Sequence, residues 1–272
     1  MGYLTTEKKK VTVNTFVEMK RDGNKIAMLT AYDYTTARLI DEAGVDSILV
    51  GDSASNVMLG NDSTLPITLD EMIVYARGVT RGCQRALVVC DMPFGSYQVS
   101  PEEGVRNAVR LIRETGVDAV KLEGGEEVAP TIERIVNAGI PVVGHLGLTP
   151  QSIHKFGGYG VRARSEVEAT KLIADAQALE KAGCFAVVLE KIPASVAQQV
   201  TDLLSVPTIG IGAGSHCDGQ VLVYADAMGL TQGFEPKFLR EFAAMGEELR
   251  RGVRAYCEAV KGDEFPNESE SY

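Results

Sequence analysis

Five short apolar runs in the chain each end in an ionisable residue. They read ILVGD, LVVCD, AVKLE, VVGH and AVVLE, and they end at Asp52, Asp91, Glu123, His145 and Glu190. Each run has the length and composition typical of a strand buried on both faces of a parallel sheet. In parallel strands these five side chains would meet at one edge. Because burying a carboxylate without a partner is costly, several of them at one edge indicate a bound cation or a reacting centre.

The residue types at this predicted edge favour a hard divalent cation such as Mg²⁺. Asp and Glu oxygens are its usual protein ligands, and the chain has no Cys/His cluster with zinc spacing. A dication held by two or three carboxylates polarises an α-keto acid, which lowers the cost of forming an enolate. A further carboxylate would then remove the proton. Lys121, on the same side of its strand as Glu123, would neutralise the carboxylate of the substrate.

Structural roles for the same residues stay open at this point. A single carboxylate at a strand end is commonly a helix cap or half of a salt bridge, although four at one edge weaken that interpretation. Lys121 could simply pair with Glu123, and His145 could simply hydrogen-bond the backbone. The segment GIGAG (210–214) would form either an anion-binding nest of N–H groups or a close packing contact.

A helix followed by glycine and then by a strand recurs four times, as in DEAGVDSILVGD and RETGVDAVKLEG. Glycine suits the positive φ at a helix C-terminus, and the short connections predict repeated βα units with parallel strands. Eight strands are predicted, at 26–31, 47–51, 87–90, 119–122, 141–144, 186–189, 208–211 and 221–224. Helices are predicted at 35–43, 69–81, 101–114, 127–137, 166–182 and 194–203, with an extra amphipathic helix at 13–20.

Eight such units favour the α/β class and a (β/α)₈ TIM barrel, with the extra N-terminal helix plugging its lower end. No linker divides the chain, so residues 1–262 are predicted to form one barrel domain and residues 263–272 a polar acidic tail. The active site of such a barrel lies at the C-terminal ends of its strands. Two long loops predicted there, 53–66 and 147–164, would close over a substrate or contact other subunits.

Composition excludes several classes of protein. The chain has 272 residues and a formal net charge of −10, and an acidic chain without a basic stripe is a poor nucleic-acid binder. No apolar run approaches the roughly 20 residues that span a bilayer. The N-terminal segment MGYLTTEKKK has no apolar stretch of a secretory signal, and the five cysteines are odd in number and scattered. We therefore expect a cytoplasmic protein with reduced thiols, binding neither membrane nor nucleic acid.

The chain also resembles the 3-methyl-2-oxobutanoate (ketopantoate) hydroxymethyltransferase family. The resemblance covers roughly residues 25–238, and the joint occurrence of GDS, GHLGLTPQ and FGGY is its most specific part. The segments that carry it are LTAYDYTTARL, VGDSASNVMLGNDSTLPITLDEM, DMPFGSYQ, VKLEGG, VGHLGLTPQS, FGGYGV, IGIGAG, CDGQVLV and PKF.

This resemblance implies a TIM barrel of the phosphoenolpyruvate mutase and isocitrate lyase superfamily. It implies a transferase that moves a hydroxymethyl group from 5,10-methylenetetrahydrofolate to 3-methyl-2-oxobutanoate through a Mg²⁺-stabilised enolate. The product would be 2-dehydropantoate, in the first step of pantothenate biosynthesis. Members of the family are cytosolic homo-oligomers, often decamers, so a decamer is expected here.

The resemblance also assigns roles to individual residues. Asp52 and Asp91 match the positions that bind Mg²⁺, and Glu123 would complete the metal site directly or through water. The keto acid would be held at these two aspartates and at Ser53 and Lys121. Glu190 matches the proton acceptor. These assignments agree with the edge of ionisable residues inferred from the strand ends. The sequence leaves open which divalent metal is physiological and which residues bind folate.

One stretch departs from the family pattern, because GVRARS follows FGGY. Arg162 and Ala163 are unusual there, and the charge of Arg162 would face either the folate tail or the surface. The departure affects the predicted loop rather than the metal site.

Three alternatives remain on the sequence alone. The first is another Mg²⁺-dependent member of the superfamily that makes or cleaves a C–C or P–C bond, although its lyases carry a loop cysteine that this chain lacks. The second is a class I aldolase using Lys121 as a Schiff-base amine. The third is a non-catalytic barrel that binds an anion or serves in an assembly.

Overall fold

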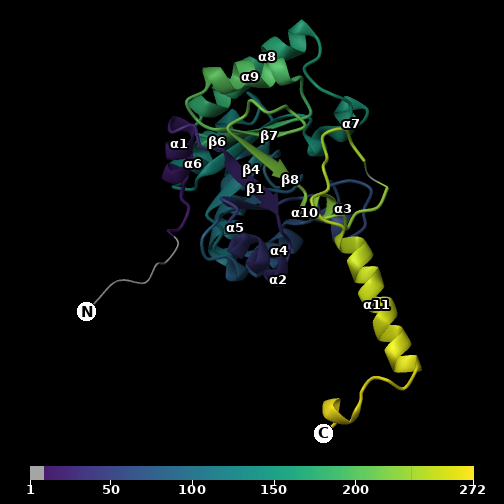
Figure 1. The fold of residues 1–272 in the computed structure, drawn as a ribbon. Coiled ribbons are helices and arrows are strands. Elements are labelled where there is room, and N and C mark those ends of the chain that lie inside the picture. Colours follow the sequence, from purple (N-terminus) through teal and green to yellow (C-terminus); the bar gives the residue numbers. More distant parts are fainter. Residues whose placement is uncertain (1–8, 234) are drawn as a thin grey trace. The chain divides into compact units, whose positions relative to one another are not determined.

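Eight parallel strands form a closed barrel in the computed structural model, which describes residues 9–233 and 235–272. Each strand pairs with the next along the chain, and β1 pairs with β8 to close the ring. The predicted (β/α)₈ fold is therefore confirmed (Figure 1). The strands are β1 (Ile26–Thr30), β2 (Ser47–Val50), β3 (Leu87–Asp91), β4 (Ala119–Glu123), β5 (Val142–Gly147), β6 (Ala186–Glu190), β7 (Thr208–Ile211) and β8 (Gly219–Leu222).

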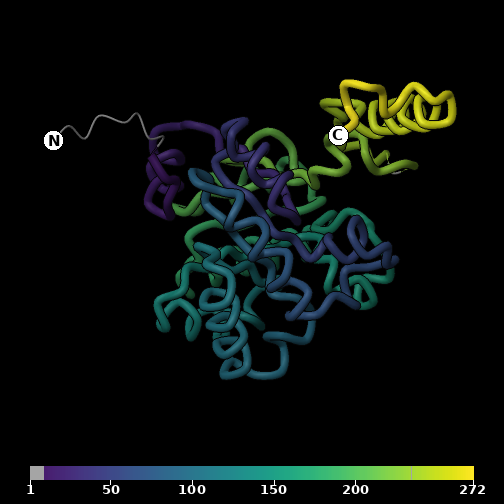
Figure 2. Tube along the Cα trace, turned by 90° about the horizontal axis from the view of Figure 1, so that it is seen from below, coloured from purple at the N-terminus to yellow at the C-terminus, as the bar shows by residue number. Residues whose placement is uncertain are grey.

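Helices follow most of the strands and lie around the barrel, as the tube in Figure 2 shows. The six predicted helices between strands and the predicted N-terminal helix are all present. They are α1 (Val13–Arg21), α2 (Tyr34–Ala43), α4 (Leu69–Gly82), α5 (Pro101–Thr115), α6 (Ala129–Asn137), α8 (Glu166–Lys181) and α9 (Ala194–Leu203). Helices that were not predicted are α3 (Ala54–Val57), α7 (Ile153–Phe156), α10 (Tyr224–Ala227) and α11 (Met245–Lys261), with 3₁₀ turns η1 (Pro150–Ser152) and η2 (Glu268–Glu270).

The last strand was predicted in the wrong place. The prediction of 221–224 followed an apolar run, whereas β8 begins at Gly219, which pairs with both Ile26 and Ile209. A Cβ at Gly219 would lie 2.5 Å from the carbonyl oxygen of Ile26, so the close approach of the neighbouring strand requires glycine. The polar and exposed Gln220 hid this strand from a search for apolar runs.

Backbone contacts divide the chain into two compact units, one ending at Leu222 and the other covering Val223–Tyr272. The second unit contains α10 and α11. The side chains of α11 repeat apolar residues every three or four positions, a helical signal that the sequence search passed over. These apolar residues are exposed: Met245, Leu249, Val253, Tyr256 and Val260. The predicted boundary at residue 262 stays a prediction, and most of the segment used to exclude a secretory signal, residues 1–8, lies outside the described residues.

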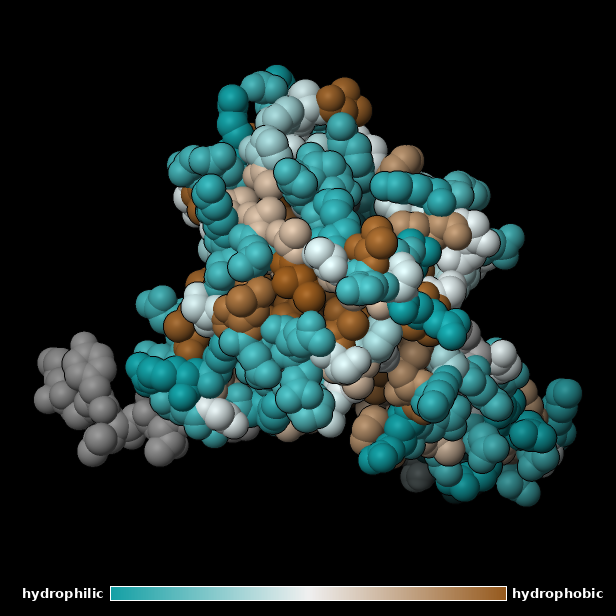
Figure 3. All heavy atoms as spheres, turned by 90° about the horizontal axis from the view of Figure 1, so that it is seen from above, coloured by the Kyte–Doolittle hydropathy of each residue, from teal (hydrophilic) through white to brown (hydrophobic). Residues whose placement is uncertain are grey.

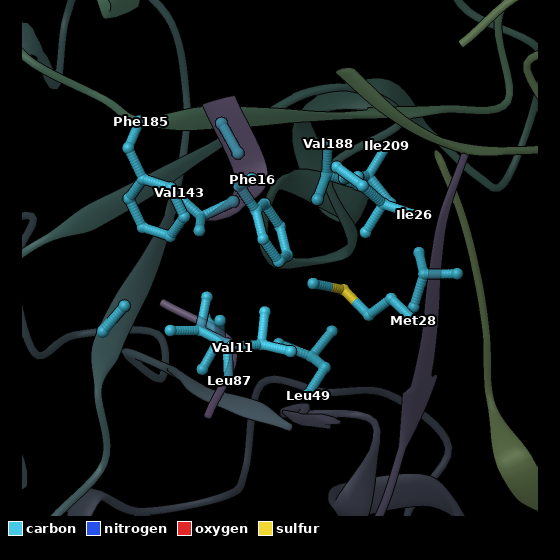
Figure 4. Close-up of a cluster of buried hydrophobic side chains, with 14 residues drawn as sticks. Val11, Phe16, Ile26, Met28, Leu49, Leu87, Val143, Phe185, Val188 and Ile209 are labelled. Atoms are coloured by element: carbon cyan, nitrogen blue, oxygen red, sulfur yellow. The ribbon is translucent and has the colours of Figure 1, made fainter. Parts of the chain in front are cut away.

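Helix α1 closes one end of the barrel, as predicted. Its Phe16 is completely buried and packs edge-on against Phe185, with ring centroids 5.8 Å apart. Met28, Val143 and other strand residues surround the same ring (Figure 4). Thr12 begins the helix, because its side chain accepts a hydrogen bond from the N–H of Thr15. The sequence thus places a capped helix whose one large apolar side chain fills the base of the barrel.

Among the described residues, no helix combines the length and the hydropathy that crossing a membrane requires. Polar side chains cover most of the face shown in Figure 3, and apolar side chains gather in a patch near its centre.

The buried carboxylate of Asp41 joins α2 to the turn before β3. It accepts hydrogen bonds from the backbone N–H groups of Gln84, Arg85 and Ala86 at 2.7–3.2 Å. Burial tends to raise the pKa of this carboxyl group, but the three backbone donors outweigh burial and lower the pKa below its ordinary 3.8. The charged form is therefore the one that stabilises the fold.

We expect Phe16→Ala to lower the free energy of unfolding by about 3–5 kcal/mol, because it leaves a cavity at the base of the barrel. Val17→Ala on the same helix is the matched control, since Val17 is 45% exposed. The change there should stay within about 0.5 kcal/mol. Urea unfolding of both variants measures the difference. Equal losses of unfolding free energy would contradict the role of Phe16 in closing the base of the barrel.

We expect Asp41→Asn to lower the free energy of unfolding by about 1–3 kcal/mol at neutral pH, because one backbone donor then faces an amide N–H₂. Since the folded-state pKa is depressed, the stabilisation by Asp41 is present above its unfolded pKa and is lost as pH falls through the folded value. Urea unfolding from pH 7 to pH 3 measures the difference in the free energy of unfolding between the parent and the variant. This difference should become smaller only at the acid end of the range. A difference that is constant down to pH 3 would contradict the role of the charge.

Candidate active site

The ionisable residues form the uppermost layer of the same barrel core. On β3, the core residues Leu87 and Val89 are followed at the next alternate position by Asp91. Ala119 on β4 precedes Lys121 in the same way. Side chains at alternate positions of a strand share one face, so the face that fills the barrel below carries the charges above. Asp52, Asp91, Lys121, Glu123 and His145 are all at most 6% exposed.

The structure brings the predicted site residues together. Strand register places Asp91 beside Lys121 and Glu123 beside His145. Glu190 ends β6 and lies 3.3 Å, through its Oε2, from Nε2 of His145. Asp52 follows β2, and its backbone N–H donates to Oδ2 of Asp91 at 3.0 Å.

Lys121 lies among three carboxylates. Its Nζ is 3.1 Å from Oδ1 of Asp91 and 3.9 Å from Oε1 of Glu123. Burial alone would lower the pKa of this amine, but the charges of Asp91, Glu123 and Asp52 outweigh burial and raise it. Lys121 is therefore a fixed ammonium. A Schiff-base lysine needs a depressed pKa, so this environment disfavours the aldolase alternative.

His145 connects Glu123 to Glu190. Its Nδ1 is 3.1 Å from Oε1 of Glu123, and its Nε2 faces Glu190. Burial and the nearby Lys121 act to lower the pKa of the imidazole, while Glu123 and Glu190 raise it by more, to about 9. Nζ of Lys121 also lies 3.1 Å from Nδ1. The ring of His145 thus lies between two carboxylates of the cluster and beside Lys121.

Ser53 lies at the edge of the cluster on the turn after β2. Its Oγ is 2.7 Å from the hydroxyl of Tyr32 at the end of β1. A Cβ on Gly51 would lie 2.7 Å from this Oγ, so a side chain at position 51 would displace the serine hydroxyl from its contact with Tyr32. The GDS motif therefore has a steric reason as well as a chemical one.

The charges of the cluster do not balance. Four carboxyl groups (Asp52, Asp91, Glu123 and Glu190) face one lysine and one histidine. Burial and the neighbouring charges of Asp91 and Glu123 raise the pKa of Asp52 well above its ordinary value, and burial also raises that of Asp91. Oδ1 of Asp91 is buried and forms an ion pair with Nζ of Lys121, 3.1 Å away. A divalent cation would supply the missing positive charge, so the donor set fits Mg²⁺.

A cation would need further ligands from water or substrate. Within residues 9–233 and 235–272, no three His, Cys, Asp or Glu side chains converge into a complete metal cage. Both oxygens of Glu123 are already engaged, Oε1 by His145 and Oε2 by the backbone N–H of Gln151 at 2.9 Å. Mg²⁺ commonly keeps several waters, which is compatible with two direct carboxylate ligands.

Sequence reasoning assigned no role to two buried polar residues of the site. Gln151 and Tyr97 contact one another, and Gln151 also contacts the carboxylates of Asp52 and Glu123. Both residues lie in motifs quoted for the family resemblance, GHLGLTPQ and DMPFGSYQ. The tyrosine hydroxyl donates to Oε1 of Gln151 at 2.7 Å and accepts from the N–H of Glu123 at 3.0 Å. Both are polar residues within loop motifs, and this feature of the sequence could have indicated a functional role for them.

The long loop 147–164 begins with η1 and α7 and returns to the end of β6. The guanidinium of Arg162 lies 4.2 Å from the ring centroid of Phe156 and donates to Glu168 at 2.6 Å. The charge that departs from the family pattern is thus held within the loop and the helix after it. Lys191, directly after Glu190, has a positive φ of 49° and accepts through its carbonyl from the N–H of Arg162.

Comparison with known proteins identifies the family. The family model described as ketopantoate hydroxymethyltransferase matches residues 10–268. The chain belongs to this family. The 3-methyl-2-oxobutanoate hydroxymethyltransferase of Parabacteroides distasonis is 60% identical over 266 residues, which are 98% of this chain and 97% of the relative. The enzyme of the same name from Flavobacterium johnsoniae is 59% identical, with 97% of each chain covered. The expectation of an enzyme of the hydroxymethyltransferase type is confirmed.

Solved structures of low sequence identity share the fold. A 2,3-dimethylmalate lyase of the PEP mutase/isocitrate lyase superfamily aligns with a TM-score of 0.59 at 17% identity, covering 96% of this chain and 91% of that one. Phosphonopyruvate hydrolase in complex with oxalate and Mg²⁺ aligns with a TM-score of 0.61 at 12% identity, over 95% and 93% of the two chains. These likenesses show that the chain shares its fold with both proteins.

Proposed function

We propose that this chain transfers a hydroxymethyl group from 5,10-methylenetetrahydrofolate to 3-methyl-2-oxobutanoate and releases 2-dehydropantoate. The observation that carries the proposal is the buried cluster of four carboxyl groups, Lys121 and His145 at the strand ends. The cluster occurs in a chain 60% identical to an enzyme named for the keto acid and the transferred group. The reaction would be the first step of pantothenate biosynthesis.

Asp52 and Asp91 are the residues that would hold Mg²⁺, with Glu123 reaching it through water. When bound, Mg²⁺ would polarise the keto acid and lower the cost of an enolate at its C3 carbon. The backbone N–H of Asp52 donates a hydrogen bond to the carboxylate of Asp91 and fixes its orientation. The carboxylate of Asp91 is therefore positioned before any ligand binds.

Lys121 and Ser53 would orient the keto acid. The ammonium of Lys121 is held by Asp91 and is buried, so its attraction for a substrate carboxylate is weakly screened. The hydroxyl of Ser53 is fixed by Tyr32 and is less deeply buried than the aspartates. Lys121 and Ser53 would orient the substrate so that its C3 proton faces a base, and neither residue would remove that proton.

Glu190 is that base in our proposal. Its side chain is 17% exposed, which makes it the most accessible carboxylate of the cluster. His145 faces its Oε2 and fixes where the proton-accepting group lies. After removal of the C3 proton, the carbanion would form a C–C bond to the methylene carbon of folate as one C–N bond breaks. Water would then replace the remaining C–N bond with a hydroxyl group, releasing tetrahydrofolate and 2-dehydropantoate.

The cellular compartment, the oligomeric state and the metal are part of the same proposal. We propose a cytoplasmic homo-oligomer, a decamer by family resemblance, that uses only small-molecule substrates. Its metal is proposed to be Mg²⁺ among the divalent ions that oxygen ligands accept.

The first test is NMR of 3-methyl-2-oxobutanoate in D₂O with the protein and Mg²⁺, and then with EDTA. We expect metal-dependent exchange of the C3 proton, and 2-dehydropantoate once methylenetetrahydrofolate is added. In Glu190→Gln the exchange should slow by about 10²–10⁴-fold, the usual worth of a general base. Glu133→Gln on the exposed face of α6 is the control.

Each departure from that result has a meaning. Folded protein with Mg²⁺ that yields no 2-dehydropantoate would overturn the proposed function. Exchange that survives EDTA would point to an imine at Lys121. Exchange in Glu190→Gln at the parental rate would remove Glu190 as the base.

Asp91→Asn tests the metal site without turnover. Because losing an outer partner of a metal ligand already costs 10–100-fold in affinity, losing a ligand should weaken Mn²⁺ binding by at least about 100-fold. Titration of free Mn²⁺ by electron paramagnetic resonance measures this, with Asp202→Asn on the exposed side of α9 as control. Affinity equal to that of the parent would rule out Asp91 as a ligand.

A further inference from the structure

The side-chain amide of Gln151 is held in one orientation by four neighbours. Its Nε2 is 3.0 Å from the carbonyl oxygen of Met92, an atom that can only accept. The nitrogen must therefore face Met92, which directs its second N–H to Oδ2 of Asp52 at 2.9 Å. Oε1 accepts from the hydroxyl of Tyr97 at 2.7 Å and from Nε2 of Gln98 at 3.0 Å. Every hydrogen-bonding site of the amide is satisfied, and the residue is 7% exposed.

The same residue reaches a second carboxylate through its backbone. The N–H of Gln151 donates to Oε2 of Glu123 at 2.9 Å. The 3₁₀ turn η1, which contains Gln151, therefore contacts the end of β4 and the turn after β2 together. The side chain and the backbone act on different carboxylates, so a substitution at this position removes the contact with Asp52 and leaves the backbone contact with Glu123.

We propose that Gln151 is a positioning residue for metal binding, which acts by fixing the carboxylate of Asp52. The N–H of the amide occupies Oδ2 and holds the plane of the carboxylate, so Oδ1 is left to a ligand. An amide suits this task, because a carboxylate at position 151 would repel Asp52 and the carbonyl of Met92. The inference rests on the proposed metal role of Asp52 and adds a residue that the ligand set does not contain.

The test is Mn²⁺ affinity, measured by electron paramagnetic resonance and by calorimetry, in Gln151→Met. Loss of an outer partner of this kind should weaken Mn²⁺ binding by about 10–100-fold. Saturating Mg²⁺ should restore most of kcat, because the reacting groups are intact. Gln199→Met, the same change on the exposed side of α9, is the matched control, and its Mn²⁺ affinity should match that of the parent.

A double-mutant cycle with Asp52→Asn separates the possible causes. If Gln151 acts through Asp52, adding Gln151→Met to Asp52→Asn should change Mn²⁺ affinity less than about twofold. Full additivity of the two substitutions would overturn the inference. Parental affinity in Gln151→Met, with affinity lost in Asp52→Asn, would also overturn it while the metal site stands. Parental affinity in Asp52→Asn would instead overturn the metal role of Asp52 in the proposed function.

Tyr97→Phe covers the case in which Gln151→Met does not fold. It deletes the hydroxyl that orients the amide and that also accepts from the N–H of Glu123, and it should weaken Mn²⁺ binding several-fold. Parental Mn²⁺ affinity in folded Tyr97→Phe would then overturn the inference.

Discussion

The site depends on one constraint, which is uncompensated negative charge buried at the upper end of the barrel. Four carboxyl groups share the upper end of the barrel with a single lysine and a single histidine, almost out of contact with water. In a low-dielectric interior each charge must be matched, or the group takes up a proton. Lys121 and His145 supply part of the match and are held as cations by it. The remaining deficit of positive charge is the reason for the proposed divalent cation.

The barrel makes this arrangement tolerable. The inward faces of the strands are filled below by a close-packed core that includes Phe16 of the N-terminal helix, and they end above in charges. The rigid core fixes the backbone from which each charged side chain projects, so repulsion between carboxylates cannot be relieved by moving the strands apart. A preorganised site of this kind lowers the cost of arranging charges during the reaction.

The residues between the charges are as important as the charges themselves. His145 bridges Glu123 to Glu190, and Gln151 bridges Asp52 to the backbone after β3. These groups give each carboxylate a fixed partner and leave particular oxygens free. Both oxygens of Glu123 are engaged by His145 and the backbone of Gln151, whereas Oδ1 of Asp91 pairs with the ammonium of Lys121. The proposed division between direct and water-mediated metal contacts follows from this difference.

The sequence by itself determined the barrel and the set of ionisable residues at its rim. Both depend on local signals, namely apolar runs of strand length, a glycine at positive φ after four of the helices, such as Gly44, and an ionisable residue at or just after the end of five strands. It misplaced β8, because Gly219 and Gln220 carry no apolar signal, and it passed over α11. Only the tertiary structure decided the roles of His145, Gln151 and Tyr97. Their partners lie 22 to 99 residues away in the chain, so no spacing encodes which oxygen each one contacts. Strand register and loop packing, which are set by the whole fold, make those choices.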